Sequence, residues 1–199
     1  MLKLAARILL SAALSTAFTG CGSKQVLPSE LKEKTLSERK EILKNAPDLE
    51  HQLYGLEEIA KYYAGHSISK ESTTEARDYA NQLLKLAPQI KDKWDYGNAI
   101  HHGNLVLGRI KLFEGDVTGA KEYLKKAGAT PGSPQLNSFG PNMTLAKELL
   151  EKGEKKAVLN YFDDCLKFWK RPTSKGTVAE WKASIEKNET PRFGPNLVY

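Results

Sequence analysis

The stretch from Trp94 to Asn104 gathers polar side chains that could do chemistry, among them two adjacent histidines, His101 and His102. If this stretch is helical, the helical period places four polar residues on one side: Asp95, Asn98, His102 and Arg109. A polar cluster that includes a histidine could transfer protons or bind a metal ion. These four residues are therefore the first candidates for a functional site.

The spacing of the histidines favours a structural or binding role over catalysis. Adjacent residues on a helix point about 100° apart, whereas zinc-binding helices place two ligands four residues apart and take a third from elsewhere. His101 falls with Leu105 and Gly108, closer to the predicted core. We therefore expect no metal site, no cofactor and no catalytic residue here. An enzyme or small-ligand site centred on the four polar residues stays open as an alternative.

Helices must position these residues, and the hydrophobic periodicity predicts helices along most of the chain and no strand. Ser72 with Glu75, and Thr177 with Glu180, have the spacing of capping boxes, and Asp116 has the place of an N-cap. Gly and Pro end the other segments. The predicted helices cover about 30–45, 48–65, 72–87, 91–114, 116–128, 142–152, 154–169 and 177–190.

One apolar stripe recurs in the second helix of each predicted pair, always with spacing i, i+3, i+4 and i+7. The three copies are Ala76-Tyr79-Ala80-Leu83, Ala120-Tyr123-Leu124-Ala127 and Val158-Tyr161-Phe162-Cys165. The first helix of each pair carries an apolar residue followed by a small one, at Ile59-Ala60, Leu107-Gly108 and Leu145-Ala146. We expect the stripes to be buried and the small residues to mark places where two helices cross closely.

These patterns resemble the tetratricopeptide repeat, a helix-turn-helix unit of about 34 residues. The resemblance covers Leu49 to Pro172 and is best from His101 to Pro134. It implies an all-α, right-handed solenoid of about three helix pairs plus a C-terminal helix, with a concave face that binds proteins or peptides. The alternative is a non-repetitive helical bundle, because all amphipathic helices share such stripes.

In the repeat register, the residue after each small residue should face the concave groove: Lys61, Arg109 and Lys147. Three cations at equivalent positions would form a basic ladder suited to a carboxylate or an acidic peptide. Relatives that grip peptide C-termini use a clamp of Lys, Arg and Asn, but Glu57, Leu105 and Met143 break that pattern here. The alternative is that these cations fall in register by chance. The predicted partner-binding residues are Lys61, Asp95, Asn98, His102, Arg109 and Lys147.

The string Phe-Gly-Pro-Asn occurs twice, at Phe139–Asn142 and at Phe193–Asn196. In the first copy, Gly140 turns the chain and we expect Phe139 to pack against the entry of the next helix. The second copy falls in a predicted irregular tail, residues 191–199; the alternatives are a chance repetition and an ordered, bound tail that uses Phe193 and Tyr199.

Residues 1–20 are typical of an export signal, because Lys3 and Arg7 precede a short apolar stretch, Ile8 to Phe18. The string Phe18-Thr19-Gly20-Cys21 resembles the bacterial lipobox, although Leu is usual where Phe18 stands. The resemblance implies cleavage before Cys21 and acylation of that residue, for example with palmitate. Gly22 in place of Asp favours the outer membrane. The alternative is an ordinary signal peptide with an incidental cysteine.

We therefore expect a signal peptide at 1–20, a lipidated cysteine with a tether and a short helix at 21–47, and a helical domain at 48–190. The net charge of +6 falls to +4 without the two signal-peptide cations, too little to argue for nucleic acid. With Cys21 acylated, Cys165 has no disulfide partner and should be a buried, inert thiol. The leading expectation is a lipid-anchored periplasmic scaffold that binds a protein or peptide. A structural spacer of the cell envelope is a further alternative.

Overall fold

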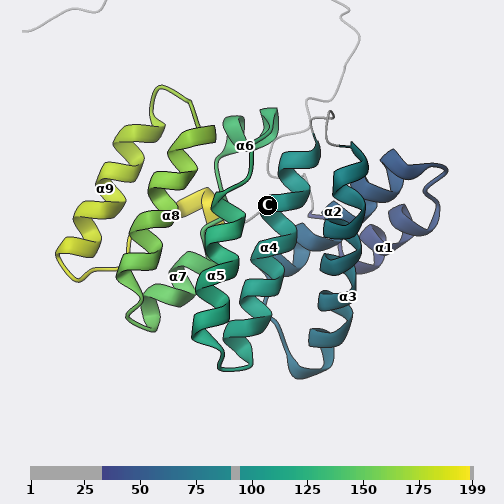
Figure 1. Ribbon diagram of the computed structural model, residues 1–199, viewed down its shortest axis with the longest axis horizontal. Coiled ribbons are helices and arrows are strands. Elements are labelled where there is room, and N and C mark those ends of the chain that lie inside the picture. The colour runs from purple at the N-terminus through teal and green to yellow at the C-terminus, as the bar shows by residue number, and fades with distance from the viewer. Residues whose placement is uncertain (1–32, 91–94, 198–199) are drawn as a thin grey trace, which may run out of the picture. The chain divides into compact units, whose positions relative to one another are not determined.

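Helices follow one another along the chain (Figure 1). The computed structural model describes residues 33–90 and 95–197, so the predicted signal peptide, Cys21 and Trp94 lie outside the described residues. No strand occurs in the described ranges, and the all-α prediction is confirmed. The elements are α1 (Leu36–Lys44), α2 (Leu49–Gly65), α3 (Lys70–Leu86), η2 (Ala87–Ile90), α4 (Asp95–Phe113), α5 (Val117–Gly128), α6 (Pro134–Phe139), α7 (Thr144–Glu151), α8 (Lys155–Phe168), α9 (Ser174–Glu186) and η3 (Gly194–Leu197).

Each long helix packs against its neighbours in the sequence and against the next pair. Helix α4 is central: it contacts α2 and α3 on one side and α5 and α7 on the other. Helix α5 also contacts α8, and α9 covers α8 (Figure 1). Residues 34–199 form one unit with its own core, so we expect this unit to fold without the preceding residues.

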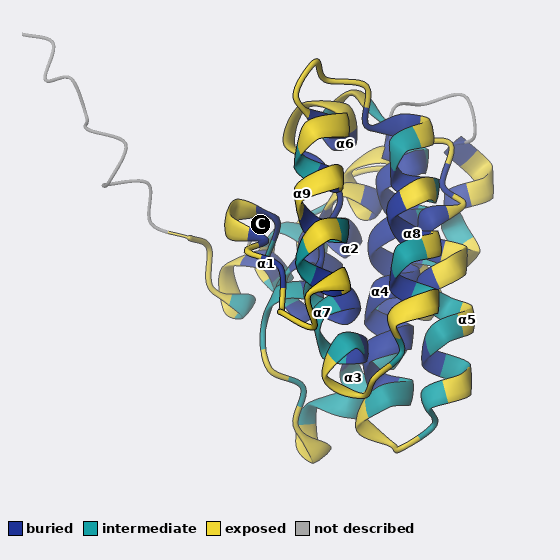
Figure 2. Cartoon of the chain, turned by 90° about the vertical axis from the view of Figure 1, so that its left-hand side faces the viewer, coloured by how far each residue is buried: buried dark blue, intermediate teal, exposed yellow. Residues whose placement is uncertain are grey.

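The predicted stripes contribute to the core and lie on the buried sides of α3, α5 and α8, beside apolar residues of α2, α4, α7 and α9 (Figure 2). Only Tyr79 and Tyr123 among their members are partly exposed. Each fully buried Leu or Phe contributes about 1.5–3 kcal/mol to the free energy of unfolding. The small residue at Gly108 allows the expected close crossing, since a Cβ there would lie 2.4 Å from Leu145 Cδ2.

Three predicted helix starts are wrong by a few residues, and the first is α1, which begins at Leu36 after the N-cap Thr35 instead of near residue 30. Helix α3 begins at Lys70, because the Ser69 side chain accepts the backbone N–H of Ser72. The carboxylate of Glu75 instead accepts hydrogen bonds from Lys40 (2.5 Å) and the Tyr63 hydroxyl (2.7 Å). Helix α9 begins at Ser174 instead of Thr177 and has no side-chain N-cap bond. In α3, the side chain expected to cap the helix instead binds residues that only the tertiary fold brings close to it.

The segment predicted as a loop between residues 128 and 141 contains a short helix, α6. The Ser133 hydroxyl caps it, and Pro134 occupies its first turn. Its last residue, Phe139, is 66% exposed, so the expected packing of Phe139 against the next helix is wrong. The turn at Gly140, with φ of 88°, directs the chain back towards α7 while leaving Phe139 outside.

The C-terminal segment packs tightly, in line with the alternative of an ordered tail for Phe193, whereas Tyr199 lies outside the described residues. Phe193 is 2% exposed, with ring centroids 5.1 Å from Trp181 and 6.1 Å from Phe162. The short helix η3 then lies against the start of α7, where Thr144 Oγ1 donates to the carbonyl oxygen of Leu197 (3.2 Å). Among the described helices, none combines the length and the apolar character that crossing a membrane requires.

Candidate functional site

The polar side of α4 is buried against α2 and α6. Asp95, Asn98 and His102 are at most 8% exposed, and the positive charge of Lys61 on α2 acts on both Asp95 and His102. Three of the predicted polar residues and one of the predicted cations therefore share one region. Arg109, two turns farther along α4, belongs to a different set of contacts.

Side-chain hydrogen bonds join α2, α4 and α6 in this region. Lys61 Nζ lies 2.7 Å from Glu57 Oε1, 3.3 Å from Glu58 Oε1 and 3.3 Å from Gln135 Oε1. The same Gln135 oxygen accepts from Asn98 Nδ2 (2.7 Å), and Asn98 Oδ1 accepts from the Ser133 hydroxyl (2.6 Å). We call these hydrogen-bonded residues, together with Asp95, on which the charge of Lys61 acts, the α2–α4–α6 network: Glu57, Glu58, Lys61, Asp95, Asn98, Ser133 and Gln135.

Burial sets the charge states of the network. It raises the pKa of Glu57 to about 7, although Lys61 opposes the rise. Burial alone would lower the pKa of Lys61, but the carboxylates of Glu57 and Glu58 hold it above its ordinary value. Burial also raises the pKa of Asp95, whose Oδ1 has no hydrogen-bond partner among the described residues. A carboxyl group that titrates near neutral pH could exchange protons, but the Glu57 side chain is only 2% exposed.

Glu57, Glu58, Ser133 and Gln135 were not predicted as site residues. The pair Glu57–Lys61 has the i,i+4 spacing of a helical ion pair, which was a usable signal. Ser133 followed by Pro134 has the order of an N-cap and a first helical residue, and this order could have revealed α6. Nothing in the sequence indicates that α6 folds over α4.

His101 is a structural residue of the core. Its Nδ1 lies 3.2 Å from the carbonyl oxygen of Ala127, and its Nε2 lies 3.1 Å from the backbone N–H of Asn142. These partners require a neutral ring that carries its proton on Nδ1. Burial lowers the pKa of His101 to about 4 and that of His102 well below its ordinary value. Both rings are fully buried, which separates them from any substrate in solvent.

Arg109 fastens the end of α2 to α7. Its Nε lies 2.9 Å from Glu148 Oε2, and its Nη1 donates to the carbonyl oxygens of Tyr63 (2.7 Å) and His66. Arg109 is 6% exposed, and its guanidinium is fully engaged. Lys147 is different: its side chain is 43% exposed and its Nζ lies 3.9 Å from Glu151.

The structure therefore does not present Lys61, Arg109 and Lys147 as one exposed row of cations. The first two are buried and engaged by carboxylates, and only Lys147 is accessible to a partner. Burying a cation is costly unless an anion accompanies it, which explains why Glu57, Glu58 and Glu148 lie beside these two positions.

A groove opens beside Arg109, between the α2–α3 connection, the end of α4, and α7. It consists of two hollows of about 310 and 320 Å³ that share Glu148 and Glu151. Phe113 at its edge is 51% exposed. We call it the α4–α7 groove; it is lined by Gly65, Ile68, Arg109, Leu112, Phe113, Thr144, Lys147, Glu148, Glu151, Lys152 and Leu197.

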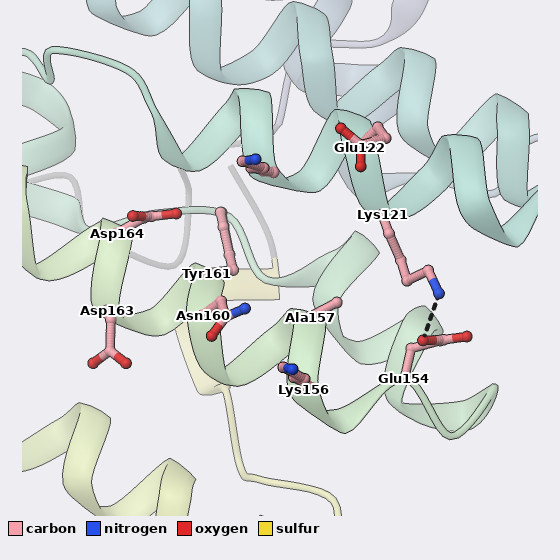
Figure 3. A pocket seen from close by; sticks show the side chains of 10 residues that line it. Lys121, Glu122, Glu154, Lys156, Ala157, Asn160, Tyr161, Asp163 and Asp164 are labelled. Atoms are coloured by element: carbon pink, nitrogen blue, oxygen red, sulfur yellow. Dashed lines mark hydrogen bonds and ion pairs between the residues drawn. The ribbon is translucent and has the colours of Figure 1, made fainter.

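A second hollow, of about 550 Å³, lies between α5 and α8 (Figure 3). The ion pair between Lys121 and Glu154 (2.9 Å) crosses it at one end. Asp163 and Asp164 lie at the other end and bind Lys182 and Lys167. Its lining mixes three lysines with four carboxylates, so its charge selects no class of ligand.

Within the part of the chain that the structure describes, no three His, Cys, Asp or Glu side chains come together as a metal site. Cys165 is fully buried, and burial raises the pKa of its thiol well above the ordinary value. The chain matches no family model, no curated protein and no solved structure.

Proposed function

We propose that the protein is a lipid-anchored scaffold of the bacterial envelope that binds a protein or peptide partner in the α4–α7 groove. The observation that carries this proposal is the half-exposed ring of Phe113 beside accessible charges of both signs, in a groove whose wall is fixed by the Arg109–Glu148 ion pair. An exposed aromatic residue on a rigid helix is a typical anchor for a protein partner.

The proposal includes a tetratricopeptide-like solenoid. Three features support it: the recurrent buried stripes, the close approach at Gly108, and the contacts of α4 with both the preceding and the following helix pair. In such an array the first helix of each pair lines the concave face. Helices α4 and α7 hold that place in the predicted register, and both line the groove.

The groove also refines the chemistry expected of the partner. Ile68, Leu112 and Phe113 offer an apolar surface, Lys147 and Lys152 offer cations, and Glu148 and Glu151 offer carboxylates. A segment with an apolar side chain between charges of both signs would fit this lining better than a purely acidic peptide.

The proposed lipid anchor is inferred from the sequence alone. The lipobox-like string before Cys21 supports acylation, and attachment by more than one chain would be needed for stable membrane binding. The proposed location is the periplasmic side of the envelope, at the outer membrane in preference to the inner one.

A small-ligand site or an enzyme at the α2–α4–α6 network is the second candidate. The neutral-range pKa of Glu57 and the unpartnered Oδ1 of Asp95 favour it, because buried groups with shifted pKa values concentrate at functional sites. The burial of these side chains argues against it, since a ligand would first have to displace α6.

The scaffold proposal is tested by retention of proteins from a detergent extract of the producing cell's envelope. The bait variant combines Phe113→Ser with Lys147→Glu, because both side chains are accessible and neither makes a buried ion pair. Replacement of Lys61 or Arg109 would break buried ion pairs and could abolish binding by unfolding. The matched control is Lys125→Glu combined with Asn160→Ser in the α5–α8 hollow.

We expect a discrete protein to be retained by the wild type and by the control, and to be lost with the groove variant. Equal retention by all three baits would exclude the α4–α7 groove as the binding site. If no protein is retained, the scaffold proposal fails. A small molecule that raises the melting temperature of the wild type but not of an Asn98→Ala variant would then favour the network.

A further inference from the structure

Basic and aromatic side chains meet where α6 ends and the chain turns from α8 into α9. The two segments lie at the same end of the upright helices, at the top of both Figure 1 and Figure 2. We call this surface the α6–α8 tip and define it by Phe139, Lys170, Arg171 and Lys175. All four residues are exposed.

Hydrogen bonds fix the two segments to each other. The backbone N–H of Lys170 donates to Asn137 Oδ1 (2.7 Å), and Arg171 Nη1 donates to the carbonyl oxygen of Ser138 (2.6 Å). Phe139 follows directly and is 66% exposed, the most exposed large apolar side chain in the described residues. The α6–α8 tip therefore exposes the aromatic ring of Phe139 on the same surface as its cations.

The charge of the tip has one sign. Neither of the segments 129–147 and 165–179 contains an Asp or a Glu. Lys167, one turn away, is paired with Asp164, whereas Lys175 makes no ion pair with another described residue. A hollow of about 380 Å³ opens beside the tip and is lined by Lys170, Arg171 and Lys175 together with the apolar side chains of Leu166, Trp169 and Pro172.

We propose that the α6–α8 tip docks on a membrane surface that contains anionic phospholipids. The cations would contact the phosphate groups, and the Phe139 ring would insert at the level of the headgroups. A membrane surface is favoured over a protein partner because the tip combines an exposed aromatic ring with cations of one sign, the combination that binds the headgroup region of an anionic bilayer. The inference depends neither on acylation of Cys21 nor on the α4–α7 groove.

The test measures co-sedimentation of residues 34–199 with phosphatidylglycerol vesicles and with phosphatidylcholine vesicles at low salt. This unit carries its own core, and leaving out residues 1–33 removes any acyl chain and the apolar N-terminal stretch. The tip variants are Phe139→Ser and the triple change of Lys170, Arg171 and Lys175 to Gln. The matched controls are Phe113→Ser, at the other exposed Phe of the described residues, and the triple change of Lys121, Lys125 and Lys156 to Gln in the α5–α8 hollow.

We expect binding to phosphatidylglycerol vesicles alone, and its loss at high salt. Each neutralised cation of the tip should weaken partitioning by roughly fivefold, so the triple tip variant should bind about 100-fold more weakly. Phe139→Ser should weaken binding by about tenfold. Each control variant should change binding by less than about twofold.

Equal binding to both kinds of vesicle, or an equal loss with the control triple variant, would overturn the proposal. Displacement by inorganic phosphate at constant ionic strength would assign the hollow to free anions instead of a membrane.

In a second experiment, the full chain is reconstituted in the same vesicles and its lysines are acetylated. Lys170 and Lys175 should be protected by phosphatidylglycerol, whereas Lys121 and Lys125 should not; equal reactivity of both pairs would contradict the docking.

Discussion

The side-chain amide of Asn196 donates to the carbonyl oxygen of Pro141, at 2.9 Å. It also reaches the carbonyl oxygen of Phe139 (3.3 Å), and the backbone N–H of Met143 donates to the carbonyl oxygen of Asn196 (2.7 Å). The second Phe-Gly-Pro-Asn string thus lies directly on the first. Gly140 is needed at the contact, because a Cβ there would lie 2.6 Å from Asn196 Nδ2.

Asn196→Ala should lower the free energy of unfolding by about 1–3 kcal/mol, because two backbone carbonyl groups lose a buried hydrogen-bond donor. Urea denaturation followed by circular dichroism measures the change. Asn160→Ala, at an exposed position of α8, is the matched control and should have little effect. If both variants lose the same free energy of unfolding, the hydrogen bonds of Asn196 do not stabilise the fold.

Gly97→Ala should destabilise the protein by about 3 kcal/mol or more. A Cβ at this position would lie 1.9 Å from the carbonyl oxygen of Gly132, so the backbone before α6 would have to move. Gly176→Ala, in the first turn of α9, meets nothing within 4 Å and should instead stabilise by up to about 1 kcal/mol, because Ala restricts the unfolded chain more than Gly does. Opposite shifts of the melting temperature are predicted, and a neutral Gly97→Ala would mean that α6 does not pack closely on α4.

The buried His101 should make the protein less stable as the pH falls. Its pKa is about 4 in the folded state and about 6.5 in the unfolded state. The unfolded state therefore binds more protons between these pH values, which lowers the free energy of unfolding by up to about 3 kcal/mol from pH 7 to pH 4. Denaturation curves of the wild type and of His101→Gln over this range measure the contribution.

The wild type must be compared with His101→Gln, because the protonation of Glu57 changes the free energy of unfolding in the opposite direction. Its folded-state pKa of about 7 exceeds the ordinary value of 4.5, so its contribution to stability grows as the pH falls from 7 to 4.5. His101→Gln should be less sensitive to acid than the wild type, whatever its stability at pH 7. Parallel curves for the two proteins would show that His101 is already protonated in the fold or remains neutral in both states.

Cys21→Ser should abolish incorporation of labelled palmitate and release the protein from the membrane fraction. Cys165→Ser should leave the labelling unchanged, because this thiol is fully buried and its pKa is raised. The measurement is radiolabelling of the full chain in a producing bacterium. Label that persists in Cys21→Ser would contradict the lipobox interpretation.

The sequence predicted the long helices and their buried sides well, since both follow from local periodicity. The stripes on α3, α5 and α8 and the Asp116 N-cap are where the spacing placed them. His101 also has the expected place in the core. These features depend on neighbours three or four residues away, which a single sequence displays.

The features that the sequence did not show depend on contacts between distant segments. Glu148 neutralises Arg109 across 39 residues, and Gln135 joins Lys61 across 74 residues. The same holds for the tail, where Asn196 finds its partners 55 and 57 residues earlier. The helical spacing of the cations predicts which face of each helix they occupy. It does not show which carboxylates from other segments will form ion pairs with them.

The most direct test of the scaffold proposal is photo-crosslinking in intact cells. Benzoylphenylalanine is introduced at Phe113, in the α4–α7 groove, and at Tyr54 on α2 as a matched aromatic control that is 36% exposed. We predict one discrete protein adduct from position 113, weakened by Lys147→Glu, and none from position 54. No adduct from position 113, or the same adducts from both positions, would contradict a partner-binding groove at α4 and α7.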